Sequence, residues 1–153
     1  MKVLLGSSSP RRAEILAFFT LPFEVVSPPF DERALLYGGD PISYVETLSK
    51  EKALSLLPRF ADSALITADT IVHKDGDLFN KPSSMEEAKA FLEQLSGSWH
   101  SVYTSLSLSY QGEIQTLTTE TKILFHPLTT SQIQAYLQST RPLDKAGGYA
   151  IQG

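Results

Sequence analysis

The apolar residues in the first half of the chain fall into short continuous runs. Residues 2–5 (KVLL) and 64–68 (ALITA) have the length and composition of buried strands. Residues 23–30 (FEVVSPPF) form a third run, which two prolines end. We therefore predict three strands in this half, the last of which leads into Asp69.

Helical spacing of the apolar residues separates these runs. Residues 10–19 predict a helix with Ser9 as its N-cap and Pro10 at its first position. Residues 40–57 predict a longer helix that begins in the same way, at Asp40 and a following proline. The apolar residues that suit one face of this longer helix are Ile42, Val45, Leu48, Leu56 and Leu57.

Strict alternation of apolar and polar residues replaces this pattern in residues 101–110 (SVYTSLSLSY). The alternation predicts a half-buried strand whose apolar side carries Val102, Leu106, Leu108 and Tyr110. Its hairpin partner is predicted in residues 112–125. Further helices are predicted in residues 83–97, with a capping box from Ser84 to Glu87, and in residues 129–140. Mixed helices and strands with one antiparallel pair indicate an α/β or α+β fold rather than a purely parallel sheet.

Composition narrows the classes of function. The 153 residues are enough for one domain with a real core, and 42% hydrophobic with 20% charged residues is typical of a globular protein. The absence of cysteine excludes disulfides and thiolate chemistry and suits a reducing cytosol. The net charge of −4 argues against a nucleic-acid partner. Neither a membrane span nor a signal peptide is expected, because no apolar run is long enough.

The sequence SSSPRR, residues 7–12, has the residue types of an anion site. The first N–H groups of a helix lack partners within the helix, and the helix dipole adds partial positive charge there. Ser7, Ser8 and Ser9 add hydroxyl donors, and the guanidinium groups of Arg11 and Arg12 suit phosphate oxygens. A capped surface helix with two solvated arginines fits the same residues equally well.

Other polar residues also admit two interpretations. Asp69, at the end of its predicted strand, suits a Mg²⁺ ligand or a general base, but also a turn that bonds its own backbone. Glu32 suits a cation ligand or an exposed loop acid. Lys81 suits a phosphate contact or a solvated surface position, and Lys52 suits a solvated position on its helix. Gln152 can read a base edge through its amide. Taken singly, none of these residues decides a function.

The segments together, in this order, are far more specific than any one of them. They are SSSPRR, DERA, LSKEKA, ADTIV, NKP, SGSWHSVYT and DKAGGYAIQG, and they span nearly the whole chain. On these segments the chain resembles the Maf-type nucleoside triphosphate pyrophosphatases. The resemblance implies a cytoplasmic enzyme that uses Mg²⁺ or Mn²⁺ to cleave a nucleoside triphosphate between its α and β phosphates. It also implies a mixed, twisted sheet flanked by helices, two lobes with a central cleft, and a homodimer in many members.

The resemblance also assigns roles to individual residues. Asp69 matches the family's proton acceptor, and Glu32 matches an acidic position that we assign, with Asp69, to metal binding. Arg11, Thr70 and Gln152 match the specificity positions of the branch that acts on dTTP and UTP. The positions that match phosphate contacts are Ser7, Ser9, Arg12, Lys52 and Lys81. Non-standard pyrimidine nucleotides are an expected further substrate class.

The chain departs from the family in a few places. Asn80 and Ser105 stand where family members usually or often have glycine. Family members continue past the glycine that matches Gly153, so residues 1–153 are expected to form one domain that lacks the usual C-terminal segment. An alternative function from another class is a regulator of cell division that binds nucleotides without cleaving them. Release of pyrophosphate from dTTP distinguishes the two.

Overall fold

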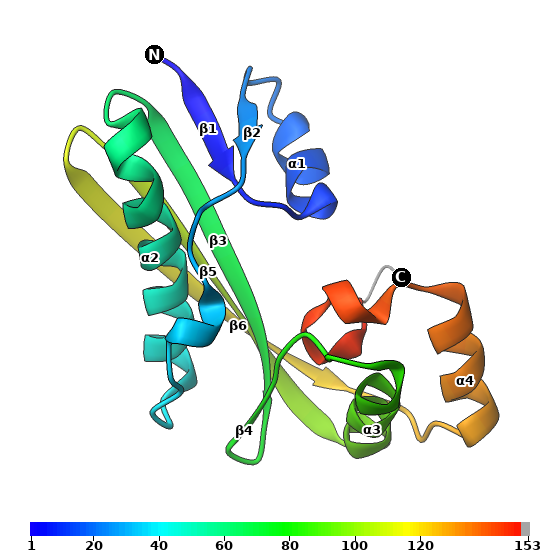
Figure 1. The fold of residues 1–153 in the computed structure, drawn as a ribbon. Coiled ribbons are helices and arrows are strands. Elements are labelled where there is room, and N and C mark those ends of the chain that lie inside the picture. The colour runs from blue at the N-terminus through cyan, green and yellow to red at the C-terminus, as the bar shows by residue number, and fades with distance from the viewer. Residues whose placement is uncertain (151–153) are drawn as a thin grey trace. The chain divides into compact units, whose positions relative to one another are not determined.

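The computed structural model describes residues 1–150 of the chain. These residues divide into two compact units. The first unit comprises residues 1–69 and 104–119, and the second comprises residues 70–103 together with the chain from residue 120 onward. Three long strands contribute residues to both units (Figure 1).

Six strands form one mixed sheet in this part of the chain. Its order is β2-β1-β3-β5-β6, with β4 also paired to β3. The strand bounds are β1 Val3–Gly6, β2 Glu24–Val26, β3 Ala64–Lys74, β4 Asp77–Phe79, β5 Trp99–Tyr110 and β6 Glu113–Leu124. β1 runs parallel to both β2 and β3, whereas β4 is antiparallel to β3. A mixed sheet with helices is the predicted fold class, which is therefore confirmed.

The predicted helices are all present. Their bounds are α1 Pro10–Ala17, α2 Pro41–Phe60, α3 Met85–Leu95 and α4 Thr130–Ser139, with short 3₁₀ turns η1 Glu32–Ala34, η2 Pro142–Asp144 and η3 Ala146–Gly148. Ser9 and Asp40 are the N-caps of α1 and α2, as the sequence predicts. The Asp40 side chain accepts a hydrogen bond from the Ile42 N–H, while the Ser9 side chain makes no capping bond.

The core of the first unit lies between α2 and the sheet. Leu4 of β1, Leu56 of α2 and Leu65 of β3 pack together and are fully buried. Gly6 permits this close approach, because a Cβ there would lie 2.6 Å from Leu56 Cδ1 and 2.8 Å from Thr67 Cγ2. Apolar burial therefore holds α2 along β1 and β3 (Figure 1).

The buried side of β5 in the first unit is the opposite of the predicted one. Ser105, Ser107 and Ser109 are at most 1% exposed, whereas Leu106 and Leu108 are 44% and 43% exposed. The alternation correctly predicted the strand, but the prediction that its apolar side faces the core is wrong. The serine side faces α2, where the hydroxyls of Ser105 and Ser107 hydrogen-bond with a helix side chain. Satisfied hydroxyls can be buried at little cost, so hydrogen bonding replaces apolar burial here.

This reversal predicts opposite outcomes for neighbouring positions on β5. Ser107→Val is expected to lower the free energy of unfolding by about 1–3 kcal/mol, because it removes a buried hydroxyl that bonds to Ser49 and Thr116. Leu106→Thr is expected to change it by no more than about 0.5 kcal/mol, because the side chain is already exposed. Urea denaturation of both variants measures the difference. A larger loss in Leu106→Thr would contradict the assignment of the buried side.

The second unit has its own core around α3 and α4. One cluster joins Ala88 and Leu92 of α3 to Ile133 and Leu137 of α4. A second cluster comprises Val72, Phe79 and Leu95. Gly147 lies against this second cluster with a φ of +71°, and a Cβ there would lie 3.0 Å from Val72 Cγ2. Gly147 therefore serves a close turn against β3 in this unit, while a Cβ at Gly148 would lie 3.7 Å from Ala88 and Pro82.

The capping box predicted for α3 forms only in part. Ser84 accepts the predicted hydrogen bond from the Glu87 N–H. The Glu87 carboxylate, however, accepts from the N–H and hydroxyl of Ser83 instead of from Ser84. A complete capping box forms at the N-terminus of α4. There the Thr129 side chain accepts from the Gln132 N–H, and the Gln132 side chain accepts from the Thr129 N–H.

His100 lies inside an aromatic cluster of the second unit. It is 4% exposed, its Nε2 hydrogen-bonds with the Tyr149 hydroxyl, and its ring meets Phe125 and Tyr149 edge-on. Burial, and next the positive charge of Lys74, lower the pKa of His100 below its usual 6.5. The folded protein therefore holds this imidazole neutral.

Acidification is therefore expected to destabilise the protein through His100. As pH falls, the unfolded chain takes up a proton on His100 that the folded state resists. The contribution of neutral His100 to the free energy of unfolding is therefore complete above pH 6.5 and is lost as pH falls toward the lowered pKa. His100→Gln should show a smaller fall in melting temperature between pH 7 and pH 5 than the unsubstituted protein. His126→Gln, at an exposed histidine, is the control and should keep the original slope. Equal slopes in all three proteins would contradict the role of His100.

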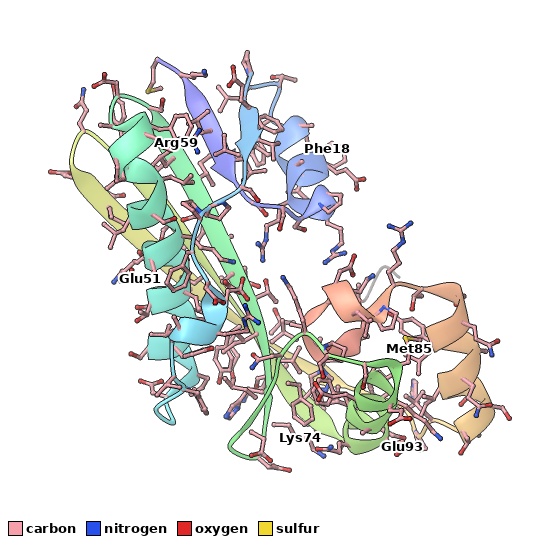
Figure 2. All side chains as sticks on the ribbon, in the orientation of Figure 1. Phe18, Glu51, Arg59, Lys74, Met85 and Glu93 are labelled. Carbon is pink, nitrogen blue, oxygen red and sulfur yellow. The ribbon has the colours of Figure 1, made fainter. Side chains whose placement is uncertain are left out.

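Some predicted apolar positions are exposed. Ile42 is 46% exposed, so its predicted place on the buried face of α2 is wrong, whereas Val45, Leu48 and Leu56 are buried as predicted. α1 has no buried residue, and Phe18, just after it, is 83% exposed (Figure 2). Leu16 is the only large apolar residue of α1 that is half-buried among the described residues.

Candidate active site

A buried lysine of the first unit lies between two carboxylates. The Lys52 Nζ is 2.6 Å from Asp69 Oδ2 and 2.7 Å from Glu32 Oε1. The Lys52 and Asp69 side chains are 10% and 9% exposed, and that of Glu32 is 38% exposed. Removing one member of so buried a group leaves an uncompensated charge, which is strongly destabilising.

Each member of this group comes from a different element. Asp69 lies within β3, which continues to Lys74, so the predicted strand end at this residue is wrong. Lys52 is on the buried side of α2, near residues of the apolar core. Glu32 begins the short turn η1, which Asp31 caps by accepting from the Arg33 N–H. Loop, helix and strand thus bring three charges together that are far apart in sequence.

The start of α1 adds a cation beside Asp69. Arg12 Nη1 donates to the Ala68 carbonyl at 3.0 Å and reaches the Ser7 hydroxyl at 3.4 Å. The same Ser7 hydroxyl accepts from the Ser9 N–H at 3.0 Å. The SSSPRR segment therefore lies next to the middle of β3, at the residue before Asp69.

Burial and the surrounding charges act on Asp69 in opposite directions. Burial is the largest influence and raises the pKa of Asp69, while Lys52 opposes it, Glu32 raises it further and Arg12 lowers it. Burial also lowers the pKa of Arg12, which the negative charge of Asp69 partly offsets. A raised carboxylate pKa makes Asp69 a stronger base than an exposed aspartate.

Tyr44 of α2 belongs to this environment, although the sequence analysis did not select it. Burial raises the pKa of Tyr44, and the charges of Asp69 and Glu32 raise it further. The phenol therefore stays protonated near the two carboxylates. Tyr44 precedes Lys52 by eight residues, which is close to two helical turns, so helical spacing was a signal that could have found it. Its ring packs edge-on against Tyr37.

The remaining predicted site residues are distributed differently. Arg11 is exposed and Ser9 is half-buried, both in the first unit at the start of α1. Thr70 directly follows Asp69 on β3 and Lys81 is exposed in the loop after β4, and both belong to the second unit. Gln152 lies outside the described residues. The structure thus joins Ser7, Arg12, Glu32, Lys52 and Asp69 in one place within the first unit.

The carboxylates of Glu32 and Asp69 are the groups that suit a metal ion here. Among residues 1–150, no group of three or more histidine, aspartate or glutamate side chains has the arrangement of a metal site. Glu32 and Asp69 nevertheless each place a carboxylate oxygen within 2.7 Å of the same ammonium nitrogen. Mg²⁺ is commonly held by one or two carboxylates together with substrate phosphates, so this donor set fits.

A family model described as Maf-like protein matches residues 2–153. The chain belongs to the Maf family. The Maf match includes every predicted site residue and both compact units.

Relatives of this Maf protein have a common name. A protein of Chlamydia caviae named dTTP/UTP pyrophosphatase is 41% identical over 152 residues, which cover 99% of this chain and 78% of that protein. A protein of Clostridium perfringens with the same name is 42% identical over 156 residues, covering 100% of this chain and 81% of that protein. At this identity and coverage, the whole described fold of the Maf chain has a counterpart in both.

Solved structures with little sequence similarity share the fold. The Staphylococcus aureus Ham1 protein has a TM-score of 0.57 at 12% identity, covering 91% of this chain and 99% of that one. A nucleoside-triphosphatase/dITP/XTP pyrophosphatase from Mycobacterium abscessus has a TM-score of 0.52 at 18% identity, covering 81% of this chain and 72% of that one.

In the described part of this Maf chain, no helix combines the length and hydropathy needed to span a membrane.

Proposed function

We propose that the protein hydrolyses nucleoside triphosphates between the α and β phosphates, with dTTP and UTP as preferred substrates. The products are the nucleoside monophosphate and pyrophosphate. The names of the Chlamydia and Clostridium relatives support this substrate class. The observation that carries the chemistry is the buried Lys52–Asp69 pair with Glu32 and Arg12 beside it. Clearance of non-standard pyrimidine nucleotides is part of the proposal.

Asp69 is the proposed base. Its carboxylate orients a water molecule and takes the proton of that water as the oxygen attacks the α-phosphorus. Burial supports this role, because it raises the pKa of the carboxylate and so strengthens it as a proton acceptor. Lys52, held against Asp69, keeps the carboxylate ionised before the reaction, since a nearby positive charge favours the charged form.

The cations and donors of the first unit are proposed to bind the triphosphate. Arg12 lies against Ser7 at the start of α1, where unpaired N–H groups and the helix dipole favour phosphate. Arg12 and Lys52 take phosphate charge there, and Ser7 and Ser9 supply hydroxyl donors. Lys81 is proposed as a further phosphate contact. Arg11, Thr70 and Gln152 are proposed to select the pyrimidine base.

A divalent metal is proposed as the cofactor, held by Glu32 and Asp69. The charges of the site support this requirement: Lys52 and Arg12 are already opposite two carboxylates, so a triphosphate brings negative charge that they do not offset. When bound, Mg²⁺ or Mn²⁺ would polarise phosphate oxygens and offset this charge. Metal dependence, a cytoplasmic location and a homodimer remain predictions.

A panel of nucleotides tests the proposal. The protein is incubated with dTTP, UTP, CTP, dATP and GTP, with Mg²⁺ or with chelator, and pyrophosphate and single phosphate are measured separately. We expect pyrophosphate from dTTP and UTP, faster than from the other nucleotides, and only with metal. Binding of dTTP without any product would favour the non-catalytic regulator. Release of single phosphates would indicate a phosphatase, and either result would refute the proposed reaction.

A further inference from the structure

A network of hydroxyl groups joins α2 to β5 and β6 in the first unit. The Ser49 hydroxyl is 2.9 Å from the Ser105 hydroxyl and 2.7 Å from that of Ser107. The Ser107 hydroxyl in turn is 3.0 Å from that of Thr116, and the Thr118 hydroxyl reaches that of Ser105 at 3.3 Å. Ser49, Ser105 and Ser107 are completely buried. We call these five residues the hydroxyl network.

One assignment of donors accounts for the bonds around Ser49. The Glu46 carbonyl, 3.1 Å from the Ser49 hydroxyl, can only accept, and when Ser49 donates to it the Ser49 oxygen accepts from Ser105 and Ser107. Ser107, which then has no hydrogen left, accepts from Thr116. A hydrogen-bonded arrangement of this kind specifies the position of a helix more sharply than contacts between methyl groups, which can slide.

Thr67 extends the network to β3. Its hydroxyl donates to the backbone carbonyl of Ser49 at 2.7 Å, and its side chain is completely buried. Thr67 precedes Asp69 by two residues on the same strand, so both side chains are on the same face of the sheet. Ser49 precedes Lys52 by three residues on α2, so the two lie on the same side of the helix.

The Thr67–Ser49 contact and the Asp69–Lys52 contact therefore both join α2 to β3. They lie two residues apart on the strand and three residues apart on the helix. A shift of α2 along β3 large enough to break the first contact also moves the Lys52 ammonium group away from Asp69. The apolar contacts of Leu56 with Leu4 and Leu65 lie on the other side of Lys52 in the helix sequence, toward its C-terminal end. They hold α2 on the sheet, but they supply no directional bond beside the lysine.

We propose that Thr67 and Ser49 are positioning residues, which hold Lys52 in place on Asp69 and Glu32 by setting the register of α2 against β3. The hydroxyl network holds the same turn of α2 against β5, through the Ser49 side chain. The inference rests on the proposed function where it concerns catalysis, because Lys52 and Asp69 are assigned to the reaction there. The register itself is a property of the fold and is testable without turnover.

The first test measures catalysis in Thr67→Val, which keeps the shape of the side chain but loses the hydroxyl. We expect kcat for dTTP to fall roughly 10-fold with KM changed less than about twofold, because small displacements of catalytic groups reduce the rate more than binding. Thr67→Ser should restore most of kcat. Ser55→Ala, which loses a hydroxyl bonded only to the Lys52 carbonyl of its own helix, is the matched control and should retain kcat.

A double-mutant cycle shows whether Thr67 acts through the lysine. In a Lys52→Gln background, Thr67→Val should cause little further loss of kcat, because the group it positions is already absent. If the fold losses of kcat in the two single variants multiply in the double variant, Thr67 affects the rate by another route and the proposal is overturned.

The second test does not depend on activity. Acetic anhydride labels lysine amines, and mass spectrometry of peptides gives the labelling rate of Lys52 relative to exposed Lys50 on the same helix. The ratio should be low in the unsubstituted protein, rise at least threefold in Thr67→Val, and stay low in Thr67→Ser and Ser55→Ala. All measurements are made well below the melting temperature of each variant.

The two tests separate the positioning role from the proposed function. If the unsubstituted protein releases no pyrophosphate but Thr67→Val exposes Lys52 to labelling, the proposed function fails and the register inference stands. If Thr67→Val lowers the melting temperature yet keeps both kcat and the protection of Lys52, Thr67 is a structural residue only and the inference is wrong.

Discussion

Asp69→Asn is expected to lower the rate of pyrophosphate release by ~10²- to 10⁴-fold while nucleotide binding persists. Asparagine has nearly the same shape as aspartate but cannot accept the proton of the attacking water. Arg12 and the start of α1 remain in place, because Arg12 donates to the backbone carbonyl of Ala68, which the substitution does not change. Steady-state kinetics with dTTP give the loss in kcat, and calorimetric titration gives the binding.

The control for this substitution is Asp62→Asn. Asp62 is exposed and lies just before β3, so it tests the same chemical change without a role at the site. It should retain full activity. Melting temperatures of both variants establish that the site variant is folded at the assay temperature. Near-normal turnover by folded Asp69→Asn would refute the assignment of the base.

Lys52→Met is expected to destabilise the fold as well as inactivate the enzyme. The substitution leaves the carboxylates of Asp69 and Glu32 facing each other without the cation between them. Breaking a buried pair by removing one partner costs about 3–5 kcal/mol, and the partial exposure of Glu32 places the expected value toward the lower end. Urea denaturation measures the change in the free energy of unfolding.

Magnesium should partly reverse this loss. A cation that binds the two carboxylates stabilises the folded state by mass action, and in Lys52→Met it no longer competes with the ammonium group. The rise in melting temperature on adding Mg²⁺ should therefore be larger in Lys52→Met than in the unsubstituted protein. Lys50→Met, at the exposed lysine two residues earlier, is the control and should change stability by no more than about 0.5 kcal/mol. Equal effects of the two substitutions would contradict the buried pair.

The helices and strands were largely predictable because their signals are local. Ser9–Pro10 and Asp40–Pro41 mark the starts of α1 and α2, since a cap residue and a proline at the first position act within one turn of the chain. The end of β3 was not predictable in this way. Its pairing with β4 through residues 72–74 extends the strand past Asp69, and that pairing depends on a second segment.

The candidate site was predictable as a set of residues but not as an arrangement. The order of the motifs selected Asp69, Lys52, Glu32 and Arg12. The family resemblance assigned Lys52 to phosphate and the two acids to metal, whereas the structure pairs the lysine with both acids directly. Contacts between a loop, a helix and a strand depend on how these elements pack, which spacing along the chain does not specify. Tyr44 was missed although its helical spacing from Lys52 is visible in the sequence.

By itself, the sequence determined most of the segments that become helices and strands, the family, and the residue types available for chemistry, because each depends on short-range patterns or on motifs in order. The strand β4 and the full length of β3 were not among them. Tertiary structure alone decided which side of β5 is buried. Leucines are more apolar than serines, and on this basis the alternation predicted the wrong side. α2 carries Ser49 and Glu46 opposite the serine side, so hydrogen bonds across the interface outweigh the transfer of Leu106 and Leu108 out of water. That choice depends on the partner surface, which comes from a different part of the chain.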